Sequence, residues 1–385
     1  MSSKQRHPTS LWTLGLLFLR LGTTAFGGPA AHIAMMEDEV VRRRRWMNHD
    51  EFLDLLGATN LIPGPNSTEM AIHIGHRQRG RPGLLVAGAS FILPAVFIVT
   101  ACAWAYVRYG SLPQVAGVLY GVKPVIIAIV LQALWSLGRA AVKSKFLALI
   151  GVLAVVLTLL RIHELLVLFG AGLLVGIARL IAQKIKSTRN ILLPTPVAFL
   201  FQASTAATTS FGLWPLFLFF LKVGAVLYGS GYVLLAFIRA DLVERWHWLT
   251  ETQLLDAIAV GQVTPGPVFT TATFVGYVLA GGRGALVATL GIFLPAFFFV
   301  AVSGPLVPRI RRSPVAGAFL DGVNVAALAL MLVVTYQLGR AALVDLTTIF
   351  LAVISAVMLF RFRVNSAWLV LAGAIIGLLL SLNPV

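Results

Sequence analysis

The chain has 385 residues, of which 58% are hydrophobic and only 11% are charged, and its mean hydropathy is +0.90. Soluble domains carry roughly a quarter charged residues, so this composition excludes a soluble globular protein and predicts an all-α polytopic membrane protein. The 30 basic and 14 acidic residues give a net charge of +16. Most bases lie between apolar segments, where they orient a chain in the bilayer, and the aromatic-interleaved basic surfaces of nucleic-acid binders are absent. We therefore expect a lipid environment and no nucleic-acid partner.

The apolar segments follow one another along the chain as two sets of six. The first set comprises residues 11–31, 51–76, 83–107, 114–138, 145–160 and 163–181. The second set comprises residues 213–236, 253–279, 284–306, 315–339, 343–360 and 365–382. A weaker stretch at 196–212 lies between the sets and makes thirteen segments in all.

The second set repeats the first at an offset of 202 residues. Pro63-Gly64-Pro65 returns as Pro265-Gly266-Pro267, and Phe18-Leu19-Arg20-Leu21-Gly22 returns as Phe220-Leu221-Lys222-Val223-Gly224. Ordered matches of this kind indicate an internal duplication. We predict a first repeat in residues 1–182, a linker with an extra crossing in 183–212, and a second repeat in 213–385.

The first two segments of each repeat are interrupted in the middle. The first is interrupted at Gly27-Gly28-Pro29 and, in its copy, at Gly229-Ser230-Gly231; the second is interrupted at the two Pro-Gly-Pro motifs. Proline removes a helical hydrogen-bond donor, so helices must stop there. Residues 51–62 alone would form a helix of roughly 18 Å, shorter than a hydrocarbon core of about 30 Å. We predict broken or re-entrant helices at these breaks.

The distribution of bases predicts opposite orientations for the two repeats. Clusters of arginine at 42–45 and 77–81 flank segment 51–76 on both sides, which favours a re-entrant hairpin open to the cytoplasm. In the second repeat Arg239 and Arg245 are balanced by neighbouring acids. We therefore expect inverted-topology repeats, an arrangement typical of secondary transporters whose substrate sites lie where half-helices meet.

The two Pro-Gly-Pro breaks are the leading candidates for a substrate site. Non-helical backbone at membrane depth is tolerated only where protein or a water-filled cavity satisfies it. The half-helix after each break directs free backbone N–H groups and a partial positive charge at the gap, which favours an anion. A purely structural kink is the alternative. The candidate ligands are the break residues themselves together with Asn60, Asn66, Ser67 and Thr68 in the first repeat and Gln262, Thr264, Thr270 and Thr271 in the second.

Two bases inside apolar segments indicate the sign of the ligand. Arg20 and Lys222 occupy the same repeat position, where a cation is costly and usually functional. Snorkelling of the long side chain to the interface is the alternative. Two cations, two helix N-termini and several neutral donors suit a small tetrahedral dianion such as chromate or sulfate.

Three carboxylates are candidates for energy coupling. Glu69 follows the first Pro-Gly-Pro break and could carry a coupling proton, or could equally be a solvated hairpin residue. Asp54 and Asp256 are equivalent in the two repeats and could pair with bases or merely complement a helix dipole. The acids at 37–39 are interpreted as a charged interfacial segment. The histidines lack partners at metal-binding spacing, so neither a metal nor another cofactor is expected.

The motifs Phe26-Gly27-Gly28-Pro29, Asn60-Leu61-Ile62-Pro63-Gly64-Pro65-Asn66 and Pro265-Gly266-Pro267 resemble those of the chromate ion transporter (CHR) family, over essentially the whole chain. The resemblance implies efflux of chromate from the bacterial cytoplasm across the inner membrane, resistance to chromate, and sulfate as a competing analogue. It places substrate contacts at the first-repeat motifs and Arg20, and less firmly at the second-repeat positions Tyr228 and Gly229. There the glycine pair becomes Gly229-Ser230 and Asn66 becomes Val268, so we expect a site weighted to the first repeat.

Other functions stay open at this point. Transport of sulfate or another oxyanion would need few changes. Membrane-embedded phosphatases for polyprenyl diphosphate also use inverted repeats and re-entrant hairpins, and Gly64-Pro65-Asn66-Ser67-Thr68 with Glu37 and Glu69 could form part of such a site. That cluster lacks an arginine beside the serine and a second serine, so we expect a transporter rather than an enzyme. Energy coupling and oligomeric state are undetermined, a homodimer being one option.

Overall fold

The computed structural model describes residues 9–26, 28–186, 210–228, 231–303 and 313–382. All secondary-structure elements assigned in these residues are helices, which confirms the all-α class. Gly27, Gly229 and Ser230 lie outside the described residues, as does nearly all of the predicted extra crossing at 196–212.

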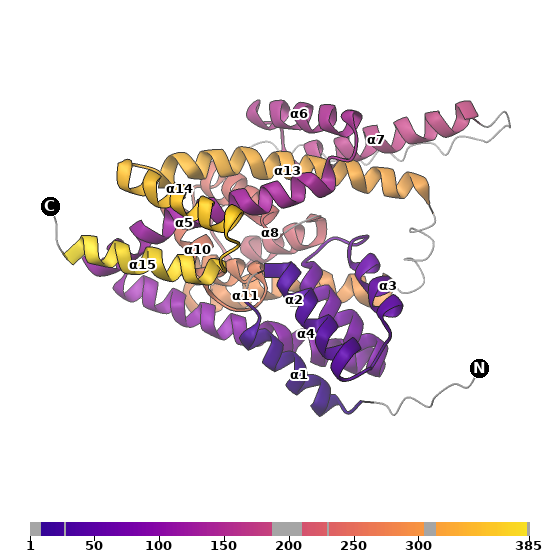
Figure 1. Cartoon of the computed structure of the whole chain (residues 1–385), viewed down its shortest axis with the longest axis horizontal. Helices are drawn as coiled ribbons and strands as arrows, with labels where there is room; N and C mark the ends of the chain where they lie inside the picture. The colour runs from indigo at the N-terminus through magenta and orange to yellow at the C-terminus, as the bar shows by residue number, and fades with distance from the viewer. Residues whose placement is uncertain (1–8, 27, 187–209, 229–230, 304–312, 383–385) are drawn as a thin grey trace.

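The helices follow the two repeats in chain order (Figure 1). In the first repeat they are α1 (Leu11–Thr24), α2 (Gly28–Glu37), η1 (Asp38–Arg43), α3 (His49–Thr59), α4 (Asn66–Tyr109), α5 (Pro113–Ala141), α6 (Lys145–Leu159) and α7 (Glu164–Lys186). In the second they are α8 (Leu213–Val226), α9 (Val233–Phe237), η2 (Ile238–Arg245), α10 (Glu251–Val263), η3 (Val268–Thr270), α11 (Thr271–Ser303), α13 (Pro314–Ala342), α14 (Leu346–Arg361) and α15 (Ser366–Leu382).

Helices end at the interruptions expected from the sequence. α3 stops at Thr59 and α4 starts at Asn66, while α10 stops at Val263 and η3 starts at Val268. The helices that enter the two breaks also begin alike. A capping box of Asn48 with Glu51 starts α3, and one of Thr250 with Gln253 starts α10, again 202 residues apart. Equivalent sequence therefore forms equivalent local structure.

The long helices α4 and α11 each fold back on themselves. Helical backbone angles are lost at Gly80 and Gly281, where φ is 61° and 59°, a region that glycine adopts without strain. In α4, Gly75 then lies so close to the backbone of Gly83 that a Cβ atom on either would collide. Each long helix is thus a hairpin of two antiparallel helices, in agreement with the separate apolar segments expected on either side of residues 77–82.

Five helices among the described residues are long and apolar enough to span a membrane: Asn66–Tyr109, Pro113–Ala141, Glu164–Gln183, Val268–Ser303 and Pro314–Ala342. Large apolar side chains face outward, with Trp12 75% exposed and Leu346 85% exposed. Such side chains are unfavourable in water over large areas and suit lipid. The protein is a multi-pass membrane protein.

The last helices of each repeat pack against the opposite repeat. α15 lies along α5, and α7 lies along α13, as Figure 1 also shows. The backbones of Gly121 and Gly373 meet directly, and Gly322 meets residues 171–172 in the same way, because small residues allow close helix approach. One buried apolar cluster accordingly includes residues of both repeats.

Candidate functional site

Each Pro-Gly-Pro break docks on the first break of the other repeat. The N–H of Gly64 donates to the carbonyl of Leu227 at 2.8 Å, and the N–H of Gly266 donates to the carbonyl of Ala25 at 3.0 Å. Both donors and both acceptors are 202 residues apart, so the contact is reciprocal, as across a two-fold axis. Gly64 and Gly266 have φ of 139° and 97°, where a side chain is strained. The two Pro-Gly-Pro breaks and the ends of α1 and α8 therefore meet between the repeats.

A cavity of about 520 Å³ lies at this junction and is called the central cavity below. One water needs only about 10–15 Å³ by a comparable measure, so the cavity has room for a small ion together with water. Breaks from both repeats and one face of α5 line it. The predicted site residues that line it are Gly28, Asn60, Pro65, Asn66, Ser67, Gln262, Thr264, Gly266 and Pro267.

Helix N-termini supply positive potential to the central cavity. α2 begins at Gly28 and α4 begins at Asn66, and both residues line the cavity. Pro65 precedes α4 and offers no side-chain cap, so the first N–H groups of that helix stay available. In the part of the chain that the structure describes, no lysine or arginine side chain lines this cavity. The groups that could attract an anion there are therefore backbone N–H groups and neutral side-chain donors.

Gln262 provides a further donor. Its Oε1 accepts a hydrogen bond of 3.1 Å from the hydroxyl of Tyr232, which orients the amide. Its Nε2 is buried and has no hydrogen-bond partner among the described residues. A buried donor without a partner is costly. Gln262 lines the central cavity, and its contact with a ligand there stays a prediction.

The wall formed by α5 was missed in the sequence. Gln132 and Ser136 line the central cavity from one face of that helix. Their spacing of four residues within the apolar segment 114–138 is the signal that could have identified them, because residues four apart share a helix face.

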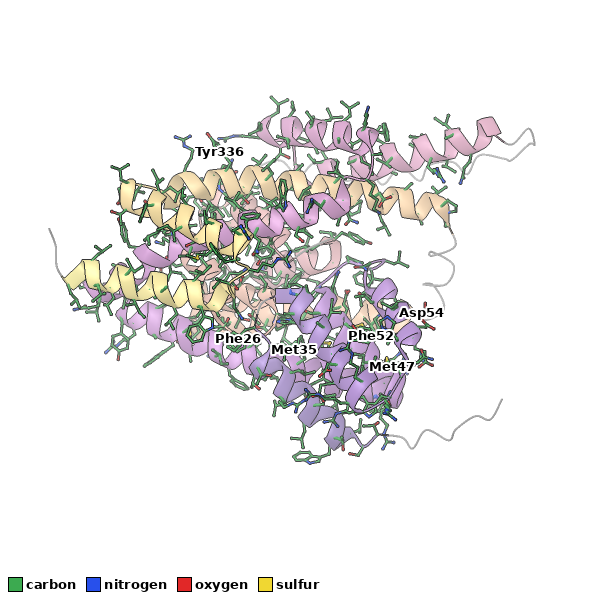
Figure 2. All side chains as sticks on the ribbon, in the orientation of Figure 1. Phe26, Met35, Met47, Phe52, Asp54 and Tyr336 are labelled. Atoms are coloured by element: carbon green, nitrogen blue, oxygen red, sulfur yellow. The ribbon has the colours of Figure 1, made fainter. Side chains whose placement is uncertain are left out.

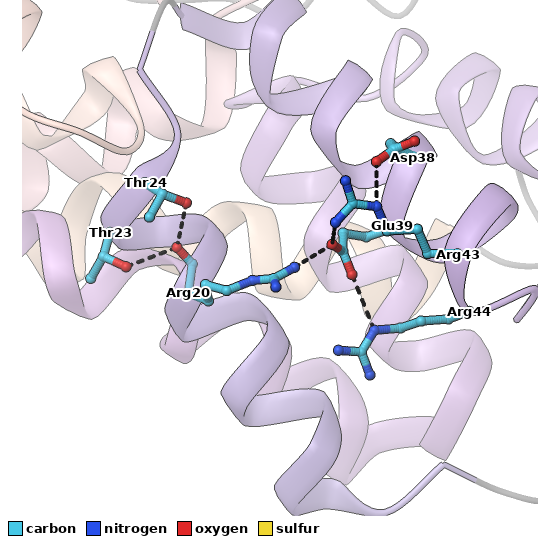
Figure 3. Close-up of polar contacts among 7 residues, drawn as sticks. All are labelled: Arg20, Thr23, Thr24, Asp38, Glu39, Arg43 and Arg44. Carbon is cyan, nitrogen blue, oxygen red and sulfur yellow. Dashed lines mark hydrogen bonds and ion pairs between the residues drawn. The ribbon is translucent and has the colours of Figure 1, made fainter.

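Arg20 is ion-paired beside the site rather than exposed to the cavity. Its guanidinium pairs with Glu39, whose carboxylate also binds Arg43 at 3.1 Å and Arg44 at 3.3 Å (Figure 3). The Glu39 side chain is only 8% exposed. Burial alone would raise the pKa of Glu39, but the hydrogen bonds from Arg20 and Arg44 and the nearby charges outweigh it and hold the pKa below its ordinary value of 4.5. Arg20 is not among the residues that line the central cavity.

Lys222 has the equivalent arrangement in the second repeat. Its Nζ lies 2.5 Å from Asp241, which also pairs with Arg245 and is buried. Neither acid is predicted as a partner from the sequence, where the first is interpreted as part of a charged interfacial segment. The same offset of 202 maps Glu39 onto Asp241 and Arg43 onto Arg245, and that signal could have found the two clusters. Direct substrate contact by the two predicted bases stays a prediction.

The three candidate coupling carboxylates have different surroundings. Glu69 is fully buried, and neither carboxylate oxygen has a hydrogen-bond partner within the described chain. Asp256 is also buried, 2.9 Å from Nζ of Lys123 and 2.8 Å from the hydroxyl of Tyr106. Asp54 lies exposed on α3 (Figure 2). A coupling role for each stays a prediction.

The other predicted residues do not line the central cavity. They are Phe26, Pro63, Gly64, Thr68, Tyr228, Pro265 and Thr270. Thr270 donates its hydroxyl to the carbonyl of Pro267 at 2.8 Å, so it supports the second break internally. Phe26 is partly exposed where the repeats meet (Figure 2).

Comparison with known proteins gives a consistent result. A family model described as chromate transporter matches residues 12–177 and 214–378. The chain is 34% identical over 383 residues to a chromate transport protein of Cupriavidus metallidurans, covering 97% of this chain and 94% of that protein. It is 30% identical over 393 residues to a chromate transport protein of Pseudomonas aeruginosa, covering 98% and 94%. No solved structure matches the chain.

Proposed function

Because the chain belongs to the chromate transporter family, we propose that it is a secondary transporter that exports chromate from the bacterial cytoplasm across the inner membrane, which confers chromate resistance. The observation that carries the proposal is the central cavity between the two repeats. Its helix N-termini and amide donors suit the oxygens of a tetrahedral dianion. The relatives named as chromate transport proteins favour chromate among such dianions.

Neutral donors also suit a site that must release its ligand. A transported ion has to bind well enough to enter and weakly enough to leave. We assign substrate contact to Asn66, Ser67 and Gln262 and to the backbone of the breaks. Arg20 and Lys222, held by buried acids, contribute positive potential near this site in the proposal.

Export can be tested with everted membrane vesicles, whose cytoplasmic face is outside. We expect these vesicles to accumulate labelled chromate, vesicles without the protein to accumulate none, and sulfate to compete. Accumulation only in right-side-out vesicles would show uptake instead of export, and a preference for sulfate would make this an oxyanion transporter of another kind. Release of phosphate from a polyprenyl diphosphate by the purified protein, without chromate transport, would replace the proposal by an enzyme.

Of the three candidate carboxylates, we assign the coupling proton to Glu69. A charged carboxylate buried without a partner is far more costly than the neutral acid, so this group exchanges a proton when its surroundings change. We expect Glu69→Gln, which mimics the neutral acid, to retain chromate binding but to lose the effect of an imposed proton gradient on the rate. Asp54→Asn, at an exposed position, is the matched control and should keep that effect. A Glu69→Gln protein that still responds to the gradient would exclude the assignment.

A further inference from the structure

A second cavity, of about 350 Å³, adjoins the central cavity. Asn60, Asn66 and Leu137 line both cavities. α5 forms a continuous wall along them, because Ser136 lines the central cavity and Ala140, one turn further, lines the second. The two spaces are therefore neighbours along one path.

The side chains of Asn60 and Asn66 are joined where the cavities meet. Nδ2 of Asn66 donates to Oδ1 of Asn60 at 2.9 Å, and this contact is called the amide bridge below. Asn60 caps the end of α3, and Asn66 is the first residue of α4. The bridge thus links the two half-helices across the first Pro-Gly-Pro break, and both of its residues line both cavities.

The second cavity extends to an exposed ion pair. Nζ of Lys143 lies 2.7 Å from Asp321, with the side chains 61% and 32% exposed, and both residues line the cavity. Exposed pairs contribute little stability, so an incoming anion can take the place of Asp321 at Lys143. Lys143 lies between the apolar segments 114–138 and 145–160, where the preference of bases for the cytoplasmic side places it toward the cytoplasm. A base at the outer end of the second cavity is what an entrance for anions from the cytoplasm requires.

The second repeat has different residues at the equivalent positions. The offset of 202 places Gln262 and Val268 where the first repeat has Asn60 and Asn66. Val268 has no side-chain hydrogen-bonding group, and Gln262 accepts from Tyr232 instead. The amide bridge is therefore specific to the first repeat.

We propose that the second cavity is the cytoplasmic entrance of the transport path and that the amide bridge is the gate between it and the central cavity. The inference rests on the proposed function for the identity of the passing ion, a small oxyanion. A single neutral hydrogen bond is weak enough to open readily. When the bridge opens, a passing oxyanion accepts a hydrogen bond from the Nδ2 of Asn66. This bond replaces the one that Asn66 had donated to Asn60.

Thiol labelling tests the gate without any transported ion. The chain contains one cysteine, Cys102, which Cys102→Ser removes. Ser136→Cys then reports on the central cavity and Ala140→Cys on the second cavity. With a membrane-impermeant thiol reagent outside everted vesicles, we expect rapid labelling of Ala140→Cys and slower labelling of Ser136→Cys. Adding Asn66→Val, the side chain of the second repeat, should raise the Ser136→Cys rate about fivefold, the factor that corresponds to about 1 kcal/mol for a neutral hydrogen bond.

A double-mutant comparison separates the gate from a general loosening. Asn60→Ala should raise the Ser136→Cys rate as much as Asn66→Val does, and the double variant should be no faster than either, because each change alone breaks the bridge. Thr264→Val, a central-cavity change at a hydroxyl that donates to the carbonyl of Val260 and takes no part in the bridge, should leave the Ser136→Cys rate unchanged. Unchanged Ala140→Cys labelling verifies the fold.

Three results would refute the gate: additive effects of Asn60→Ala and Asn66→Val on the Ser136→Cys labelling rate, no increase of that rate in either variant, or equal labelling rates of Ser136→Cys and Ala140→Cys when the bridge is intact. Faster labelling from right-side-out vesicles would contradict the cytoplasmic placement. The expected labelling together with absent chromate transport would overturn the proposed function and leave the gate standing.

Discussion

The two repeats share a scaffold but present different groups to the central cavity. Both dock a Pro-Gly-Pro break on the other repeat and hold a buried acid between bases. At the breaks, however, Asn60 and Asn66 bond to each other, whereas Gln262 faces the cavity and Val268 is apolar. The contacts that assemble the site are thus duplicated, while the contacts available to a ligand differ between the repeats.

One contact between an acidic and a basic side chain is kept in both repeats, but the acid and the base have exchanged positions. Glu37 lies 3.1 Å from His49 in the first repeat, and the equivalent positions in the second hold Arg239 and Glu251 at 2.5 Å. The contact is retained although acid and base have changed places.

The largest expected loss of stability comes from replacing the glycine of each Pro-Gly-Pro break by alanine. This comparison tests whether the two breaks are equally closely packed. A Cβ on Gly266 would collide with Ala95, whereas one on Gly64 would meet the movable carboxylate of Glu69. Backbone strain of about 1–3 kcal/mol applies to both, and overpacking adds about as much at the rigid contact. We expect Gly266→Ala to lower the free energy of unfolding by roughly 4 kcal/mol and Gly64→Ala by roughly 2 kcal/mol, measured by thermal unfolding in detergent. Equal losses would show that the two breaks are equally constrained.

The next effect compares the two buried acids. Asp241→Asn leaves Lys222 and Arg245 without their shared partner, which costs about 3 kcal/mol after allowance for their partial exposure. Glu39→Gln should cost about 1 kcal/mol, because two of the bases around Glu39, Arg20 and Arg43, are more than half exposed. Unfolding in detergent measures both variants. A larger loss of unfolding free energy in Glu39→Gln than in Asp241→Asn would show that the Glu39 cluster contributes more to stability than the Asp241 cluster.

A smaller effect is expected at the cavity wall, where the amide Nε2 of Gln262 is buried without a hydrogen-bond partner among the described residues. Gln262→Ala removes a donor to a charged ligand, a contact that contributes about 1.5–3 kcal/mol. We expect the KM for chromate to rise at least about tenfold with little change in unfolding temperature. Thr270→Val, whose hydroxyl bonds the backbone inside the break, is the control and should leave the KM nearly unchanged. An unaltered KM in Gln262→Ala would remove this residue from the ligands.

The smallest effect is a pH dependence of the first cluster. The pKa of Glu39 is lowered in the folded protein, so its stabilising contribution is complete above the ordinary value of 4.5 and is lost as the pH falls through the lower, folded value. We expect wild-type protein to lose at most about 1 kcal/mol more than Glu39→Gln over that acid range. Parallel unfolding curves of the two proteins against pH would contradict the assignment.

Local features of this molecule could be predicted from sequence, because proline, glycine and capping residues act on their own backbone. The ends of α3 and α10 follow from the Pro-Gly-Pro motifs alone. The docking of Gly64 on Leu227 could not be predicted in the same way, since an internal offset tells which residues are equivalent and not which residues touch. The partners of Arg20 and Lys222 were missed for a related reason: the acids lie about twenty residues further along and approach only through the turn into α2 and α9.

The exchange of terminal helices between the repeats determines an order of assembly. α5 ends at Ala141, but α15, the helix that covers its glycine face, begins only at Ser366. During synthesis the glycine face of α5 therefore stays in contact with lipid until α15, the last helix of the chain, has been inserted. The first repeat completes its packing last, and two halves produced from separate genes could form the central cavity only by supplying each other's final helices.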